Sequence, residues 1–296
     1  MRVAVPIVAV LLVSSVTYAA DPTPLARARM LYNSGDYDGA IAAAALARMQ
    51  PAAADAAALV EARAHIERYR RGAEATDLEA AREALNAIRA AVLSPRDQVD
   101  FLVGLGQSLY FTDLFGPAAD LFDTALERGT LLADHDRVML LDWWATALDR
   151  EAQAAPPDRR ARLNARIMER MDAELRRDPS SAPANYWRAV SARGSGDLDT
   201  AWDAAVAAWV RAALGPTGSQ LRTDIDRLVT EAIIPERARS RQGHEQADAA
   251  ESLRNQWSLI NEQWKKADLT TFAKATVVRR SVTRRRKACA TRGCGV

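Results

Sequence analysis

The stretch Asn33–Ile41 reads NSGDYDGAI, and 161 positions later Gly194–Trp202 reads GSGDLDTAW. In each copy a Gly-Asp pair separates two alanine-containing segments, which is typical of a tight turn between two helices. A turn that is written twice predicts repeated helical hairpins. A single catalytic centre would not need the duplication.

Small and apolar residues keep a fixed spacing around this turn. In the first copy they are Ala28, Leu31, Ala40, Ala44 and Ala47. Adding 78 gives Gly106, Leu109, Ala118, Phe122 and Ala125, and adding a further 83 gives Ala189, Ala192, Ala201, Ala205 and Ala208. Small residues at matched positions on two antiparallel helices let the backbones approach closely. Three copies in one register therefore predict three equivalent hairpins.

This pattern resembles the tetratricopeptide repeat, a helix-turn-helix unit of about 34 residues. The resemblance implies an all-α fold, a right-handed α-solenoid of about five TPR-like units over residues 20–213. The offsets of 78 and 83 exceed two such units, so one degenerate unit with a lengthened loop is expected in each gap. We expect these units to pair 57–70 with 78–92, and 135–150 with 160–177 around a loop containing Pro156 and Pro157.

Two further helices are expected in residues 214–268, at 221–238 and 246–266. The second carries an apolar stripe at heptad-like spacing, formed by Leu253, Trp257, Ile260 and Trp264. Such a stripe is typical of capping helices that cover the open end of a repeat array. The alternative is a helix that binds a partner.

The composition agrees with a helical globular protein. Apolar residues make up 49% of the 296 residues and aromatic residues 6%, and clear period-two alternation is missing. The tryptophans of the repeat region are Trp143, Trp144, Trp187, Trp202 and Trp209. We expect most of them to pack in the helical core, and an aromatic groove is the alternative.

No pattern of catalytic or metal-binding residues was found. The three histidines, His65, His135 and His244, are widely spaced, and no H-E-x-x-H motif or nearby cysteine accompanies them. The acidic pair Asp36 and Asp38 is repeated at Asp197 and Asp199, which favours a turn over an acid–base pair. The sequence therefore predicts a protein that is not an enzyme, with no catalytic residues, no metal site and no cofactor.

The resemblance implies that the first helix of each unit lines a concave surface. The residues expected to face it are Arg29, Tyr32, Asn33, Gln107, Tyr110, Tyr186 and Arg193. Tyrosine with arginine and asparagine suits an extended peptide, because these side chains offer broad contact area and several donors. An ordinary solvated face is the alternative. We expect a scaffold for a protein or peptide whose identity the sequence does not give, with no specific nucleic-acid partner.

Residues 1–19 are interpreted as a secretory signal peptide. One cation, Arg2, precedes the apolar run Val3–Val13, and small residues follow, with cleavage after Ala19 or Ala20. An uncleaved membrane anchor is the alternative, but a span needs about 18 to 20 apolar residues. We therefore expect a periplasmic or secreted bacterial protein without a transmembrane segment in its mature form.

Positive charge is concentrated at the C-terminus. Between positions 20 and 268 there are 31 basic and 38 acidic residues, whereas residues 269–296 carry eight basic and no acidic residues. This composition predicts a disordered basic tail, which gives an alternative function, binding to an anionic polymer or membrane surface. An unselected extension is the other interpretation. The only two cysteines, Cys289 and Cys294, lie in this tail, and export would favour a disulfide between them.

Overall fold

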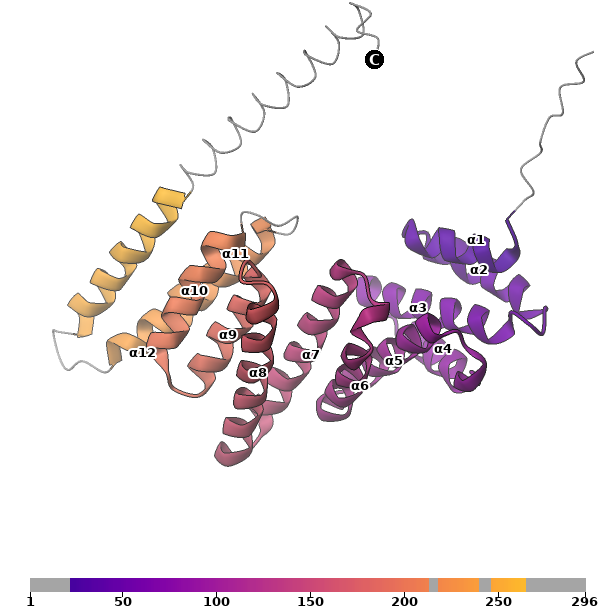
Figure 1. The fold of residues 1–296 in the computed structure, drawn as a ribbon, viewed down its shortest axis with the longest axis horizontal. Coiled ribbons are helices and arrows are strands. Elements are labelled where there is room, and N and C mark those ends of the chain that lie inside the picture. The colour runs from indigo at the N-terminus through magenta and orange to yellow at the C-terminus, as the bar shows by residue number, and fades with distance from the viewer. Residues whose placement is uncertain (1–21, 213–217, 240–245, 265–296) are drawn as a thin grey trace, which may run out of the picture. The chain divides into compact units, whose positions relative to one another are not determined.

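A computed structural model describes residues 22–212, 218–239 and 246–264, and these residues are helical with no strand among them (Figure 1). The predicted all-α fold is confirmed. The signal peptide 1–19, the tail 269–296 and the expected Cys289–Cys294 disulfide lie outside the described residues. The chain divides between Ser108 and Leu109 into two compact units, and each is described by itself.

Unit 1 consists of helices that pack against their neighbours in the sequence. Its elements are α1 (Pro24–Asn33), α2 (Tyr37–Arg48), α3 (Ala54–Gly72), α4 (Ala75–Asn86), the short 3-10 helix η1 (Ala90–Val92) and α5 (Pro95–Tyr110), whose last two residues belong to unit 2. α1 packs on α2, α2 on α3 and α3 on α4, and α1 also contacts α3. Two first helices of successive hairpins therefore lie side by side.

Unit 2 repeats this arrangement. Its elements are α6 (Phe115–Glu127), the 3-10 helix η2 (Gly129–Leu131), α7 (Asp134–Ala154), α8 (Pro157–Arg177), α9 (Ala182–Gly194), α10 (Leu198–Ala212), α11 (Gly218–Arg227), the π-helical segment η3 (Leu228–Ile233), α12 (Ile234–Arg239) and a helix over 246–264. Each helix from α6 to α10 packs on the next, and α10 packs on α11. α7 also contacts α9, so first helices again lie next to each other.

The same turn closes three hairpins. Its central residues, Gly35, Asp113 and Gly196, have φ angles of 80°, 59° and 83° and keep the 78 and 83 offsets of the sequence pattern. In each copy the N–H of this residue donates to the carbonyl three residues earlier, and the next N–H donates to the carbonyl five residues earlier. This bonding pattern is the Schellman motif, which satisfies carbonyl groups at the end of a helix. Asp113 adopts the left-handed conformation without being glycine, which aspartate tolerates better than most residues.

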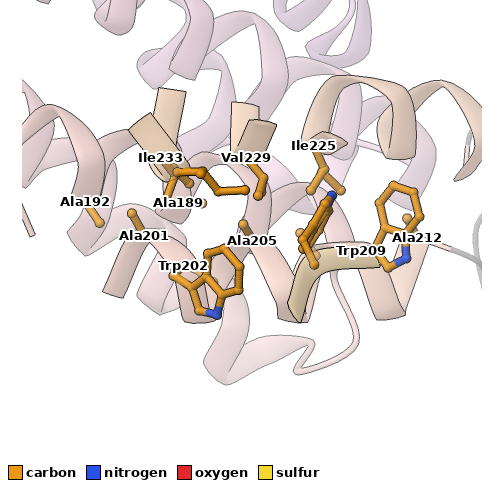
Figure 2. Packing of buried hydrophobic residues seen from close by; sticks show 14 of the residues in the cluster. Ala189, Ala192, Ala201, Trp202, Ala205, Trp209, Ala212, Ile225, Val229 and Ile233 are labelled. Carbon is orange, nitrogen blue, oxygen red and sulfur yellow. The ribbon is translucent and has the colours of Figure 1, made fainter. Parts of the chain in front are cut away.

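The spaced small residues form the helix contacts. In all three copies they are buried, apart from the partly buried Leu31 and Leu109. Figure 2 shows the third copy, where the alanines of α9 and α10 lie with Ile225, Val229 and Ile233 in one cluster. Trp202 and Trp209 belong to the same cluster, and Trp144 and Trp187 are also buried. The predicted core position of most tryptophans is confirmed, and Trp143 is partly buried.

The loop expected around Pro156 and Pro157 is shorter than predicted. α7 continues to Ala154 and α8 begins at Pro157, so only two residues connect them. Proline is favourable at the first position of a helix because its missing N–H would have no partner there. The additional length of this gap instead lies in α7 and α8, which have 21 residues each.

The two C-terminal helices are present where the sequence predicts them. The expected helix 221–238 is divided into α11, η3 and α12, and the second is described over 246–264. Trp257 is buried against Trp202 and Trp209, and its indole N–H donates to Asp226 at 2.8 Å. Trp264, at the end of the stripe, keeps 39% of its surface exposed.

Replacing Ala118 tests the tight packing around α6. Ala118 is fully buried, so Ala118→Leu should overpack the contact and lower the free energy of unfolding by about 1 to 3 kcal/mol. Thermal and urea denaturation measure the change. Ala161→Leu, at an exposed position of α8, is the control and should change stability little. Equal stability of the Ala118 variant and the wild type would contradict the proposed packing.

The turn makes a second prediction. A Cβ at Gly196 would meet nothing within 4 Å, so Gly196→Ala isolates the cost of the left-handed backbone. We expect a loss of about 1 kcal/mol in urea denaturation. Gly72→Ala is the matched control, because its Cβ would make only an ordinary contact, 3.8 Å from Glu74, and its backbone is helical. A loss at Gly72 as large as at Gly196 would rule out the backbone explanation.

Candidate partner-binding face

The predicted site residues of unit 1 lie among matched charges. Arg29 on α1 pairs with Asp97 on α5 at 2.9 Å. Arg63 on α3 pairs with Asp100 on α5 at 2.8 Å, and its guanidinium lies 4.6 Å from the centre of the Tyr32 ring. These ion pairs therefore join the first helices α1, α3 and α5 of unit 1. Their charges are already paired, so few of them are left to bind a partner.

The remaining predicted residues of unit 1 differ in exposure. Burial raises the pKa of Tyr32, and the nearby Arg63 opposes this rise. Asn33 is exposed at the end of α1. Gln107 keeps only 8% of its surface exposed. Of these three residues, Asn33 is the most accessible to a partner.

Tyr110, in unit 2, belongs to an aromatic cluster. Its ring lies 5.2 Å from Phe115, 5.7 Å from Phe111 and 5.1 Å from Trp143, with edge-to-face geometry in each pair. Such pairs stabilise packing beyond the burial of apolar area. Tyr110 therefore packs against α6 and α7, and only part of its surface is exposed.

The two predicted residues of α9, Tyr186 and Arg193, lie near polar side chains of other helices. Arg193 pairs with Glu236 of α12 through two nitrogens, at 2.7 and 3.0 Å. Trp187, beside Tyr186, donates its indole N–H to Asp142 of α7 at 2.8 Å. α9 therefore contributes to a face that includes α7 on one side and α11 and α12 on the other.

Three carboxylates of this face affect the pKa of Tyr186. Burial raises the pKa of the Tyr186 hydroxyl to about 12, and the negative charges of Asp224, Asp142 and Asp149 add to the rise, while Arg227 opposes it. A tyrosine in this environment stays neutral and keeps its proton as a hydrogen-bond donor. The face thus combines an aromatic ring with acidic groups from α7 and α11.

The acidic groups of this face form no ion pair within the described part of the chain. Asp142 accepts the indole N–H of Trp187, Asp149 accepts from Gln153 at 2.7 Å, and Asp224 faces Gln220 at 3.4 Å. Loss of water around the carboxylates raises the pKa of Asp142 and of Asp149, and Asp224 adds to the rise at Asp142. Arg150 and Arg193 partly offset the charge of Asp149.

Apolar side chains continue the face along α7. Val138 and Met139, one turn before Asp142, keep 41% and 48% of their surfaces exposed. Residues three or four positions apart share one side of a helix, so this pair lies beside Asp142. We call this surface the α7–α9–α11 face, and it is formed by Val138, Met139, Asp142, Asp149, Tyr186 and Asp224.

Sequence analysis identified Tyr186 and missed the acidic residues. Tyr186 and Arg193 lie three positions before and four positions after the buried Ala189. Asp142 and Asp149 have the same offsets from the buried Ala145. Asp142 and Asp149 of α7 therefore correspond in position to Tyr186 and Arg193 of α9.

His65 has a structural partner. Its Nδ1 lies 2.8 Å from Asp77 Oδ1, and Arg68 also contacts Asp77 at 3.2 Å, so α3 and α4 are joined by this group. Over residues 22–212, 218–239 and 246–264, no three His, Cys, Asp or Glu side chains come together in a way that could hold a metal ion. Among the helices described, none combines the length and apolarity needed to cross a membrane.

Comparisons with protein-family models, with curated proteins and with solved structures found no match for this chain.

The pKa shift of Asp142 makes stability depend on pH. The pKa of Asp142 in the folded state is above its unfolded value of about 3.9. As pH rises from the unfolded pKa to the folded pKa, ionisation of Asp142 therefore destabilises the fold. Asp142→Asn should therefore raise the melting temperature at pH 7, and the gain should shrink toward pH 4. Its amide oxygen can still accept the Trp187 N–H. Asp203→Asn, at an exposed site on α10, is the control, and a gain independent of pH would exclude this cause.

Proposed function

We propose that this chain is a non-enzymatic scaffold that binds a cationic, extended segment of a protein or peptide on the α7–α9–α11 face. In this proposal the paired helices belong to a right-handed, TPR-like solenoid of about five units, capped at the C-terminal end. The described first helices of unit 2 then present Tyr186 and the acidic groups to the partner.

The observation that carries the proposal is the set of carboxylates without ion pairs around Tyr186. Elsewhere in the described residues, many carboxylates of the helix surfaces pair with arginine, as Asp97 does with Arg29 and Glu236 with Arg193. Removing water from a carboxylate costs free energy unless a cation or donor compensates. An arginine or lysine of a partner would pair with these carboxylates, of which Asp142 is exposed and Asp149 and Asp224 are half-buried.

The apolar part of the face indicates the character of the partner. Val138 and Met139 are exposed beside Asp142, and methionine adapts its shape to different apolar surfaces. Tyr186 offers an aromatic ring with a polar tip, a combination enriched at interfaces. A segment that mixes cationic and small apolar side chains would satisfy both parts of the face.

The proposed cellular setting follows from the N-terminal sequence. The Arg2 cation, the apolar run and the small residues before Asp21 support export to the envelope of a bacterium. The partner would then be an envelope or secreted protein, met outside the cytoplasm.

A second candidate function is binding of the basic tail to an anionic polymer or membrane surface. Eight basic and no acidic residues in positions 269–296 favour it. Anionic lipid vesicles separate the two functions, because they should attract the tail and be repelled by the carboxylates of the α7–α9–α11 face.

The proposed function predicts binding of a cationic peptide. The probe is a short, labelled peptide that alternates arginine and valine, and fluorescence anisotropy measures its Kd. Asp142→Asn, Asp149→Asn and Asp224→Asn together should weaken binding about tenfold, equivalent to about 1.4 kcal/mol, because three attractive charges are removed. A peptide that alternates glutamate and valine should bind more weakly than the cationic probe.

The control is a second triple variant, Glu127→Gln, Glu169→Gln and Asp203→Asn. It removes the same number of exposed charges from the second helices α6, α8 and α10. Binding should remain near wild type in this control, and circular dichroism should show intact helices in both variants. If both triple variants lost the same affinity for the cationic peptide, the loss would be an effect of net charge alone. If neither variant lost affinity, the proposed site would be refuted.

A further inference from the structure

The outward side of α2 is apolar and exposed. The buried residues of this helix share one side, and the residues on the opposite side are Ala42, Ala45, Leu46 and Met49. Leu46 keeps 62% of its surface exposed and Met49 keeps 80%. Met49 is the C-cap residue and still has right-handed helical backbone angles, so it continues the same side. We call these four residues the outer α2 stripe.

The same register positions are polar or partly covered on α6 and α10. Adding 78 to the stripe gives the polar residues Asp120, Asp123, Thr124 and Glu127 of α6. Adding 161 gives Asp203 of α10 and the partly buried Val206, Ala207 and Val210. Val206 packs against the cluster that includes Trp257 of the helix 246–264. Apolar residues at these positions are thus partly covered on α10 and exposed on α2.

We infer that the outer α2 stripe is the contact surface of a homodimer, in which the α2 helices of two copies of this chain pack antiparallel about a two-fold axis. This inference goes beyond the proposed function, because the stripe lies in unit 1 and the α7–α9–α11 face lies in unit 2. An interface with two-fold symmetry uses the same residues in both copies, so the stripe must be complementary to itself.

The sizes of the four side chains meet this requirement. Ala42 and Met49 are equally far along the chain from the midpoint between Ala45 and Leu46. A two-fold axis through this midpoint places Ala42 of one copy at the level of Met49 of the other copy. It likewise places Ala45 at the level of Leu46. Each small side chain then faces a large one, which fills the space between two close helices.

The charges at the ends of α2 favour the antiparallel direction. Asp38 lies in the first turn and Arg48 in the last turn, and no charged residue lies between them. Antiparallel helices place the acidic start of one copy beside the basic end of the other, whereas parallel helices would bring like charges together. Asp38 and Arg48 also pair with Arg68 at 3.0 Å and Glu61 at 2.8 Å within unit 1. The end charges therefore select the direction, and the apolar stripe supplies the attraction.

The extent of the stripe determines the strength of the dimer. The 12 residues of α2 form a helix about 18 Å long. With a helix diameter of about 10 Å, its outward side covers on the order of 200 Å². A typical stable interface buries roughly 800 Å² of each partner. The dimer is therefore weak, and its population rises with protein concentration.

A weak dimer still affects partner binding. Two copies joined through unit 1 carry two α7–α9–α11 faces, so a partner with two binding segments gains affinity without any new kind of contact. This consequence rests on the proposed function, whereas the dimer itself does not.

Sedimentation equilibrium of the full chain tests the dimer. The wild type should shift from monomer toward dimer as protein concentration rises. Leu46→Gln with Met49→Gln should weaken dimerisation about tenfold or more, because each copy loses two large apolar side chains from the contact. Met139→Gln with Leu259→Gln is the matched control, since it removes the same two exposed residue types from unit 2. A wild type that stays monomeric, or equal weakening in both double variants, would overturn the inference.

A cysteine near the proposed axis tests the register. Under mild oxidation with copper phenanthroline, Ala45→Cys should form a disulfide between two copies, which mass spectrometry identifies in the peptide containing position 45. Ala161→Cys, at an exposed position of α8, is the control and should form far less of this product. Equal cross-linking at the two positions would contradict the antiparallel arrangement.

Neutral phosphatidylcholine vesicles test a lipid surface as the alternative occupant. Helices that bind anionic membrane surfaces carry several cations on their polar side, and α2 has only Arg48. Uncharged vesicles also avoid attraction of the basic tail. Wild type that floats with the vesicles, loses this binding in Leu46→Gln with Met49→Gln and forms no dimer would refute the inference. A dimer that these substitutions weaken, without flotation of the wild type, supports it.

Discussion

The close approach of paired helices depends on the small residues at matched positions. Ala28 and Ala189 on first helices, and Ala40 and Ala201 on second helices, have no exposed surface. No side chain separates the backbones there, so larger groups such as Phe122 and Trp202 fill the space on either side. Because this contact fixes the orientation of each hairpin, it also determines which side of α7 and α9 faces outward.

The first helices of the two units differ in whether their charged side chains form ion pairs. In unit 1, Arg29 and Arg63 reach across to the carboxylates of α5, so the charges are matched within the fold. In unit 2, Asp142 and Asp149 accept hydrogen bonds from the neutral donors of Trp187 and Gln153, and Arg150 and Arg193 only partly offset the charge of Asp149. Similar helical scaffolds thus present one surface whose charges stabilise the structure and another whose charges remain to be compensated. This difference is why we assign partner binding to unit 2.

Sequence alone predicted the helical hairpins and their register, because the small residues and the Gly-Asp turns are local signals. It did not predict that Asp113 takes the place of glycine in the second turn, since its left-handed conformation follows from the neighbouring hydrogen bonds. Helix lengths in the degenerate units were also missed, because Pro157 starts α8 immediately after α7. Of the residues that form the candidate α7–α9–α11 face, the sequence predicted only Tyr186. The pairing of Arg29 with Asp97, 68 positions away, and the gathering of acids around Tyr186 depend on tertiary contacts that local patterns do not contain.

The π-helical segment Leu228–Ile233 changes the phase of the helix that contains it. A π turn holds more residues than an α turn, so the residues after it are rotated relative to a continuous α-helix. One residue corresponds to about 100° of rotation. Ile233 and Ile234 are adjacent and both fully buried, and two positions later Glu236 reaches Arg193 of α9. Removal of one residue from this segment would turn Glu236 away and release Arg193 toward the acids of α7. The number of residues in the segment thus sets the charge balance of a face that the segment itself does not form.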